Sequence, residues 1–409
     1  MQLIKTAWKY GRFFLATYVM IIGIVLMAVG GSALANFLIT VGIIFLVLDL
    51  TLGEDFNIYQ YDNPNIFYPM QYASQLISVG TCLMFAWVLG VPNDFLGIAA
   101  VVQGLTGFDM IAAHANDTIG FYVACAIVAG LGAGIGSIGI GHELTHRKDM
   151  PFANFMGRLG QAFGMHTRFS IRHPYGHHNW ICTPKDPAWA RRGENFYPFA
   201  IRSIIGQNVQ VWELETGRLK KMGKSIWSWE NQVLRGWGME LIALSLFVIA
   251  AGWVGVIGFL AVGLFVNIGL ELANYIEHYG LCRVPSEPQQ VRHAWNDNHK
   301  MSYWGTVAIS RHSHHHADAD VEFWDLKPFP KEAPAMPFGY GLTGISCLIP
   351  PLWHTLMNPL LIKWDEEMAS EEEKILAAKE NILSGQSMLV NAANEYYDAH
   401  PDALIPQAA

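Results

Sequence analysis

Long apolar stretches dominate the first third of the chain and return once later. Four segments, at 13–30, 33–50, 72–90 and 120–141, approach the roughly 20 apolar residues that a membrane-spanning helix needs. A fifth run, 239–273, is too long for one span and carries several glycines near its middle. We interpret it as a tight helical hairpin that turns at these glycines. The pattern therefore predicts six transmembrane helices.

Three further segments are not predicted to span the membrane. The segment 94–112 is interrupted by glycine and polar residues, and it is expected to be interfacial or re-entrant. The segment 338–357 contains Pro350–Pro351 and is expected to lie at the interface. The charged stretch 365–384 predicts a surface helix, followed by a loose tail.

The positive charges support this pattern. The chain has 26 Lys and Arg residues, yet 13–146 and 236–282 contain none. A cation at the bilayer centre costs about 2.5–3.5 kcal/mol on insertion scales, so such gaps indicate membrane spans. The positive-inside rule places Lys5, Lys9 and Arg12 in the cytoplasm. Six spans then bring every other cation, and both termini, to that side.

Together these features predict an all-α, polytopic membrane protein with a cytoplasmic histidine-rich region. Five scattered cysteines without a C-x-x-C pair argue against a disulfide framework, a zinc ribbon or a rubredoxin-type iron centre, and a net charge of −8 does not suggest a nucleic-acid partner. The expected order is transmembrane helices 1–4 (1–141), a cytoplasmic domain (142–238), helices 5–6 (239–273), a second cytoplasmic domain (274–364), and a charged helix with a tail (365–409).

Histidine is concentrated in the predicted cytoplasmic parts. Thirteen of the sixteen histidines lie between 142 and 316, and most of these fall in four groups: HELTH, RHPYGHHNW, NYIEHYGL and RHSHHHADAD. A single histidine is usually a structural hydrogen-bonding residue. Nine or more packed together without metal would be costly to desolvate and would repel once protonated, so the groups indicate a metal site.

The number of histidines exceeds what one metal needs. HELTH fits the zinc-protease pattern H-E-x-x-H, but a zinc site takes three or four protein ligands. Two metals account for the number better than one. Imidazole suits iron, copper and zinc alike, so ligand type leaves the metal open.

The four groups resemble the histidine boxes of the integral-membrane alkane hydroxylases and of their xylene and p-cymene monooxygenase relatives. The resemblance runs from about LDLTLGED (48–55) to PPLWHTLMNP (350–359). It implies a non-haem di-iron enzyme of the bacterial inner membrane that uses O₂ to hydroxylate a terminal or benzylic methyl group. It also implies a soluble electron donor, either rubredoxin with its reductase or a flavin/iron–sulfur reductase.

The resemblance also implies which residues bind the two irons. The family's ligands correspond to His142, His146, His173, His177, His178, His278, His312, His315 and His316. The sequence departs from the family at His314, where Asp is common, and at Arg172, where Glu is common. We expect His314 to face solvent or to lie behind the ligands.

Other residues near the boxes are candidates for orienting the ligand rings, with helix caps and surface ion pairs as equal alternatives. They are Glu277, Asp186, Asn274 and Glu143. Cations that could dock an acidic electron carrier, or simply obey the positive-inside rule, are Arg191, Arg192, Arg218, Lys220, Lys221 and Lys224. The hydrocarbon is expected to enter from the bilayer along the spans, with 33–50 as the candidate helix beside its path.

Two other functions remain open at this point. A lipid desaturase or hydroxylase of the histidine-box class would share the di-iron chemistry but act on an acyl chain. A metal transporter would instead place its ligands near the middle of the bilayer. The histidine groups lie at or beyond the predicted cytoplasmic ends of the spans, which argues against transport.

Overall fold

The computed structural model describes residues 2–404, and within this range the elements are helices joined by turns and loops, without a β-strand. This confirms the predicted all-α class. Five helical segments are long and apolar enough to cross a membrane. Their principal helices are α2 (Leu15–Val29), α3 (Ala33–Thr51), α4 (Phe67–Leu89), α7 (Ile119–Gly134) and α13 (Gln232–His278).

The spans pack around α4, which contacts α2, α7 and α13. Small residues allow this close approach. A Cβ atom added at Gly130 of α7 would lie 2.6 Å from the Phe265 ring, and one added at Gly132 would lie 3.0 Å from Thr81. Glycine is commonly used in this way where transmembrane helices meet. By contrast, α3 lies at the edge of the bundle, with only 11% of its apolar window buried.

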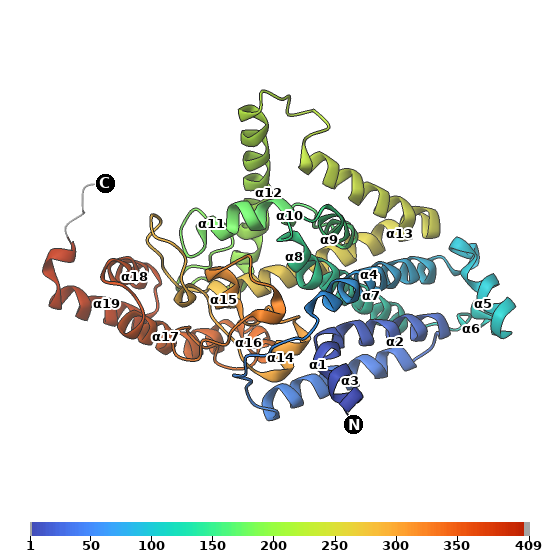
Figure 1. Ribbon diagram of the computed structural model, residues 1–409, viewed down its shortest axis with the longest axis horizontal. Coiled ribbons are helices and arrows are strands. Elements are labelled where there is room, and N and C mark those ends of the chain that lie inside the picture. Colours follow the sequence, from blue (N-terminus) through green and yellow to red (C-terminus); the bar gives the residue numbers. More distant parts are fainter. Residues whose placement is uncertain (1, 405–409) are drawn as a thin grey trace.

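The long helix α13 turns back on itself, as Figure 1 shows. Its helical geometry is interrupted at Ala251 and Gly252, where Gly252 adopts φ 58° and ψ −136°. This conformation is essentially restricted to glycine. A Cβ added at Gly255 would lie 2.0 Å from the Phe247 carbonyl oxygen, so the two arms touch closely. The predicted hairpin is confirmed, whereas the count of six membrane crossings stays a prediction.

Most of the remaining helices lie at one end of the spans, and the short helices α5 (Ile98–Thr106) and α6 (Met110–Ala113) lie at the other end (Figure 1). The first group carries the histidines. It consists of α8 (Ile140–Thr145), α9 (Pro151–Phe163), α10 (Phe169–Arg172), α11 (His178–Trp180), α12 (Phe196–Lys221), α14 (Lys300–Gly305), α15 (His312–Ala317), α16 (Tyr340–Cys347) and α17 (Pro350–Glu367).

Two expected domain boundaries fall inside continuous helices. The helical segment Ile119–His146 runs past position 141, and α13 runs past position 273. The first histidine group and His278 are therefore carried on extensions of apolar helices. This arrangement fixes part of the site rigidly to the membrane-spanning bundle.

The C-terminal region differs from the prediction. The expected single helix over 365–384 is divided between the end of α17 and α18 (Glu371–Leu383), with a break at Met368 to Ser370. The expected loose tail is wrong up to residue 399, because α19 (Ser387–Ala399) packs against α18. Leu389 and Ala393 of α19 are buried, and this apolar stripe explains why the segment is ordered.

Candidate metal centre

Five buried histidines converge on one point. Their potential ligand nitrogens lie within 4.8 Å of one another, and the group consists of His142, His146, His173, His178 and His315. Four of the Nε2 atoms form a closed ring. His142 Nε2 lies 2.8 Å from His173 Nε2 and 3.0 Å from His315 Nε2. His178 Nε2 lies 3.0 Å from His173 Nε2 and 3.1 Å from His315 Nε2.

His146 completes this five-histidine group as an apex. Its ring centroid lies 5.0 Å from those of His142 and His173, and 4.8 Å from those of His178 and His315. Its Nε2 atom is buried and has no hydrogen-bond partner. Four Nε2 atoms thus form a ring, and the His146 ring approaches all four of the other rings.

These distances fit a bound metal ion better than hydrogen bonding. Two nitrogens bound at right angles to one metal, each at about 2.1 Å, lie about 3.0 Å apart. Hydrogen bonds could satisfy at most two of the four contacts around the ring, because a neutral ring nitrogen either carries a hydrogen or accepts one. The five-histidine group therefore has the donor set and the spacing of a metal site.

A second group contains four buried histidines, namely His177, His278, His312 and His316. His312 Nε2 lies 3.1 Å from His278 Nε2 and 2.9 Å from His316 Nε2. A carboxylate adjoins this four-histidine group, because Glu277 Oε2 lies 3.2 Å from His312 Nε2. The other oxygen of Glu277 accepts a hydrogen bond of 2.9 Å from the Tyr340 hydroxyl. Glu277 therefore lies on the ligand side of the rings rather than behind them.

Helical periodicity assigns some of the histidines to their groups. Residues four apart lie on one helix face. His142 and His146, in α8 and at its end, both belong to the five-histidine group, and His312 and His316 of α15 both belong to the four-histidine group. His315 lies on another face of α15 and joins the first group. One short helix thus contributes to both groups.

A π-helical turn assigns the histidines of the second box. The segment His173–His177 is π-helical, and Pro174 lies inside it. Proline lacks the N–H that an α-helical hydrogen bond would use, and a π-turn aligns residues five apart. Accordingly His173 pairs with His178, while His177 points to the other group. A second π-helical turn, Ile135–Gly139, precedes the first box.

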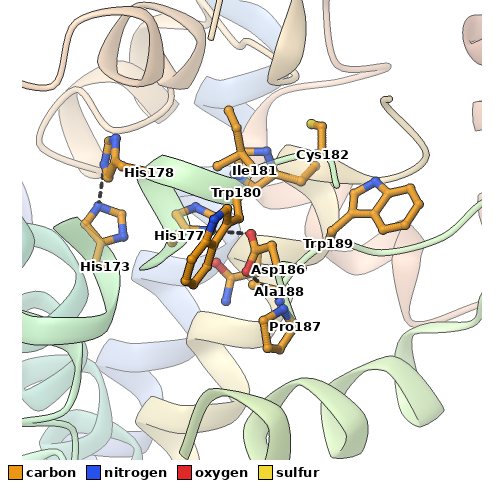
Figure 2. Close-up of polar contacts among 12 residues, drawn as sticks. His173, His177, His178, Trp180, Ile181, Cys182, Asp186, Pro187, Ala188 and Trp189 are labelled. Carbon is orange, nitrogen blue, oxygen red and sulfur yellow. Dashed lines mark hydrogen bonds and ion pairs between the residues drawn. The ribbon is translucent and has the colours of Figure 1, made fainter. Parts of the chain in front are cut away.

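Asp186 holds one ligand ring from behind, as Figure 2 shows. Its Oδ2 atom lies 2.7 Å from His177 Nδ1, and its Oδ1 atom accepts hydrogen bonds from Arg172 and from the backbone N–H of Ala188. Such carboxylate partners fix the orientation of metal-binding histidines. Burial alone would raise the pKa of Asp186, but Arg172 and His177 hold it well below its usual range. Asp186 is thus a carboxylate at neutral pH.

The other two candidates for orienting the rings make different contacts. Glu143 pairs with Arg147 and approaches the backbone N–H of Phe323 at 3.4 Å. Asn274 donates to Glu271 at 3.4 Å. Neither forms a hydrogen bond to a ligand ring in the described chain. Arg172, which the sequence marked only as a departure from the family, proves to be the partner of Asp186.

His314 belongs to neither group. It is buried, accepts a 2.9 Å hydrogen bond from the backbone N–H of Lys327, and packs edge-on against Phe329. The alternative that His314 faces solvent is therefore wrong. These contacts hold the loop after α15. The neighbouring histidines of α15, and not His314, belong to the two groups.

Histidines of the five-histidine group that lie outside the spans are kept neutral by burial. Burial first, and then the surrounding histidines, hold the pKa values of His173, His178 and His315 well below the ordinary 6.5. A neutral imidazole offers a lone pair, which is the form that binds a metal. The groups are thus ready for metal at neutral pH.

A small cavity of about 20 Å³ lies between the two groups and the spans. Histidines of both groups line one side of it. The other side is largely apolar and includes Ile138, Phe169, Leu270, Ala273 and Ile309. No residue of 33–50 lines this cavity, because α3 lies at the edge of the bundle. The expectation that the hydrocarbon enters along the spans beside 33–50 stays a prediction.

The cations proposed to dock an electron carrier differ in their exposure to solvent. Arg192 is buried and forms a two-pronged ion pair with Asp365 at 2.6 Å, so the expectation that it docks a carrier is wrong. Arg191, Lys220 and Lys221 are exposed. Lys220 and Lys221 lie in the last turn of α12, whereas Arg191 lies before its first residue, so these cations are at opposite ends of the helix.

The chain resembles one protein family and several known proteins. Residues 117–343, which contain all four histidine groups, match the family model described as fatty acid desaturase. The chain is 39% identical over 228 residues to "Alkane 1-monooxygenase" of Acinetobacter baylyi, a match that covers 54% of this chain and 55% of that protein.

Two other relatives match over more of the chain. "Alkane 1-monooxygenase" of Ectopseudomonas oleovorans is 31% identical over 333 residues, which cover 78% of this chain and 76% of that protein. "Xylene/toluene monooxygenase hydroxylase component XylM" of Pseudomonas putida is 29% identical over 356 residues, which cover 83% and 86%. The match thus spans about half the length of the Acinetobacter relative and about three quarters of the Ectopseudomonas one.

Proposed function

The chain belongs to the fatty acid desaturase family and, within it, to the alkane 1-monooxygenases, and on this premise we propose that it hydroxylates the terminal methyl group of a hydrocarbon. The observation that carries this proposal is the convergence of nine buried histidines into two groups beside a largely apolar wall. The substrate class includes alkanes and alkylaromatic compounds with a methyl group, because relatives of both kinds match the chain.

We propose that each group binds one iron ion. The five-histidine group would hold one iron through His142, His146, His173, His178 and His315. The four-histidine group would hold the other through His177, His278, His312 and His316, with Glu277 as a fifth ligand. When bound, the two irons would supply the redox chemistry that activates O₂, which histidine side chains alone cannot perform.

The reaction balances as R–CH₃ + O₂ + 2 e⁻ + 2 H⁺ → R–CH₂OH + H₂O. The histidines of the two groups would supply the ligands, and Asp186 orients the His177 ring. Burial of both groups excludes bulk water. The apolar wall formed by Ile138, Leu270 and Ala273 would face the methyl group. Because a cavity of about 20 Å³ holds little more than one water molecule, side chains of this wall must move when the hydrocarbon binds.

The electrons must come from a separate protein. We propose rubredoxin with its reductase, or a flavin/iron–sulfur reductase, as the donor. Exposed cations would favour an acidic carrier either at Lys220 and Lys221, at the end of α12, or at Arg191, before its beginning. We also place the chain in the bacterial inner membrane with both termini and the histidine groups on the cytoplasmic side, where such donors are found.

One experiment tests the metal and the activity together. The purified chain is analysed for iron and assayed with octane and with p-xylene in the presence of O₂ and a reducing partner. About two irons per chain and a terminal or benzylic alcohol are expected. His315→Ala should lose iron, whereas His314→Asp should keep it, because His314 contacts Lys327 and Phe329 rather than either group.

Other outcomes would contradict the proposal. Zinc as the only bound metal, or no O₂-dependent product from any hydrocarbon, would reject a di-iron monooxygenase. Introduction of a double bond into an acyl chain, without hydroxylation of hydrocarbons, would instead assign the chain to lipid desaturation. Equal iron loss in the His314 and His315 variants would reject the assignment of ligands.

A further inference from the structure

A second cavity lies away from the metal centre, between α12 and the two arms of α13. Its volume is about 390 Å³, within the roughly 300–1,000 Å³ of small-molecule sites. Figure 1 shows α12 running across the direction of the spans, with α13 leaving its end and folding back. Polar residues Arg168, Glu240 and Asn267 and apolar residues Ile204, Leu260 and Leu264 line the cavity.

The apolar side of this cavity opens toward the lipid-facing surface of the bundle. Leu260 and Leu264 lie on the second arm of α13 and are 49% and 60% exposed. Trp237, which also lines the cavity, is 47% exposed near the beginning of the first arm. Tryptophan is enriched where protein meets the lipid headgroups. The cavity therefore lies at the depth of the headgroups, with its apolar part toward the acyl chains.

The polar side contains a buried cation without a carboxylate partner. Arg168 is 8% exposed, and it forms no ion pair with any residue of the described range 2–404. Its guanidinium donates to Asn267 Oδ1 and, at 3.3 Å, to the Met165 carbonyl, while its Nε atom is buried without a partner. Glu271 and Glu240 attract this charge, but neither forms an ion pair with it. A buried guanidinium without a direct ion pair is unfavourable, and an anion in the cavity would provide one.

A carboxylate in the same cavity, that of Glu240, accepts hydrogen bonds through only one of its two oxygens within the described chain. Glu240 Oε1 accepts hydrogen bonds from the backbone N–H of Thr167, at 2.9 Å, and from its hydroxyl, at 2.6 Å. These contacts leave Oε2 for a ligand. The polar side thus offers one cation and one carboxylate, which matches a ligand that carries both charges.

We propose that this cavity binds phosphatidylethanolamine. Arg168 binds the lipid phosphate, Glu240 accepts a hydrogen bond from the primary ammonium, and Leu260 and Leu264 contact an acyl chain. A choline headgroup fits less well, because its quaternary ammonium has no hydrogen to donate. A hydrocarbon fits less well still, because it would leave both charges without a partner. This inference does not depend on the proposed hydroxylation.

Native mass spectrometry of the full chain in detergent tests the proposal. The purified chain is mixed with equal amounts of phosphatidylethanolamine, phosphatidylcholine and phosphatidylglycerol, and the lipid that stays bound is identified by mass. One phosphatidylethanolamine per chain is expected, preferred over phosphatidylcholine about tenfold, the effect of one charge-assisted hydrogen bond.

Conservative variants separate the two charges. Glu240→Gln keeps the acceptor that holds Thr167 but removes the negative charge, so the preference for ethanolamine over choline should fall toward one. Arg168→Gln should weaken all three phospholipids about tenfold or more, as loss of a charged hydrogen-bond donor does. Arg168→Lys should restore part of the binding because it keeps the positive charge.

A matched pair of variants tests the place of binding. Leu264→Trp fills the cavity and should reduce lipid retention. Ile257→Trp introduces the same side chain one heptad earlier on the same arm, at a position that is 55% exposed and does not line the cavity. Retention by this control should equal that of the unaltered chain.

Three results would overturn the proposal. They are equal retention of ethanolamine and choline lipids by the unaltered chain, unchanged retention in Leu264→Trp, and displacement of the lipid by octane at low concentration. The last result would identify the cavity as a hydrocarbon portal. Because the readout is bound lipid rather than turnover, a chain that fails to hydroxylate still gives a clear answer here.

Discussion

At the scale of single residues, the orientation of the ligand rings depends on a few buried contacts. The chain Arg172–Asp186–His177 is the clearest of these, since Arg172 and Asp186 are each about 1% exposed at the side chain. Asp186 is held as a carboxylate by Arg172 and in turn accepts from His177. Loss of its charge should therefore affect the metal as well as the fold.

We predict that Asp186→Asn weakens iron binding about 10- to 100-fold, the usual effect of removing a carboxylate partner from a metal-binding histidine. Iron per chain during titration with a chelator measures this. Asp365→Asn is the matched control, because it breaks another ion pair to a buried arginine, Arg192, away from the ligand rings. The control should lower thermal stability but not iron per folded chain. Equal chelator resistance of Asp186→Asn and the unaltered chain would contradict the prediction.

A second prediction concerns pH. Burial alone would raise the pKa of Glu373, but hydrogen bonds from His293 and Arg292 lower it to about 2, against an ordinary 4.5. A lowered carboxyl pKa stabilises the fold fully above pH 4.5, and this contribution is lost as the pH falls from 4.5 toward 2.

The melting temperature of Glu373→Gln should therefore lie below that of the unaltered chain at pH 6, and the difference should shrink below pH 4.5. Glu371→Gln, an exposed change in the same helix turn, is the control and should show no such trend. A difference that is independent of pH would show that the charge of Glu373 contributes nothing.

The residues of the site could be predicted from the sequence only in part. The four boxes and their resemblance gave the nine histidines, because residue type and spacing are visible in the sequence. The role of Arg172 could not be predicted, because its partner Asp186 lies 14 positions away and only the fold brings them together. The burial of Arg192 was missed for the same reason, since Asp365 is 173 positions away.

At the scale of elements, the division of the histidines between the two groups depends on helix type. In a regular α-helix His177 would lie on the same face as His173, four positions before it. The π-helical turn His173–His177 instead aligns His173 with His178. The histidine spacing alone did not reveal this turn, and so the sequence left the division of the ligands open.

We predict that insertion of one alanine after Tyr175 abolishes iron binding at the five-histidine group, because His178 would then lie six positions after His173 and would point away from it. Iron per chain should fall to about half that of the unaltered chain, or lower if both groups are disturbed. Tyr175→Ala is the control, since this side chain is 47% exposed and the turn keeps its length. Normal iron content in the insertion variant would contradict the role of the turn.

At the scale of the whole molecule, the hydrophobic pattern was the strongest guide. The apolar runs identified the long helices and the hairpin at Gly252, because these features follow from local composition. The position of α3 at the edge and the packing of α19 against α18 were not predicted, because both depend on contacts between distant segments. The expected path of the substrate along 33–50 stays a prediction.

The proposed orientation in the membrane can be tested by cysteine labelling. The five native cysteines are buried. Leu105, in α5, is 82% exposed at the end of the bundle opposite the histidines, and Glu371, in α18, lies at the histidine end. A membrane-impermeant maleimide should label Leu105→Cys in intact spheroplasts and Glu371→Cys only after lysis. The reverse pattern would place the histidine groups outside the cytoplasm.

The central claim is that the two histidine groups support insertion of one oxygen atom from O₂ into a terminal methyl group. Its most direct test is mass spectrometry of the product formed from octane by the iron-loaded chain and a reducing partner under ¹⁸O₂. The expected product is 1-octanol that carries one ¹⁸O atom. Unlabelled 1-octanol, octene, or 2-octanol as the main product would contradict it.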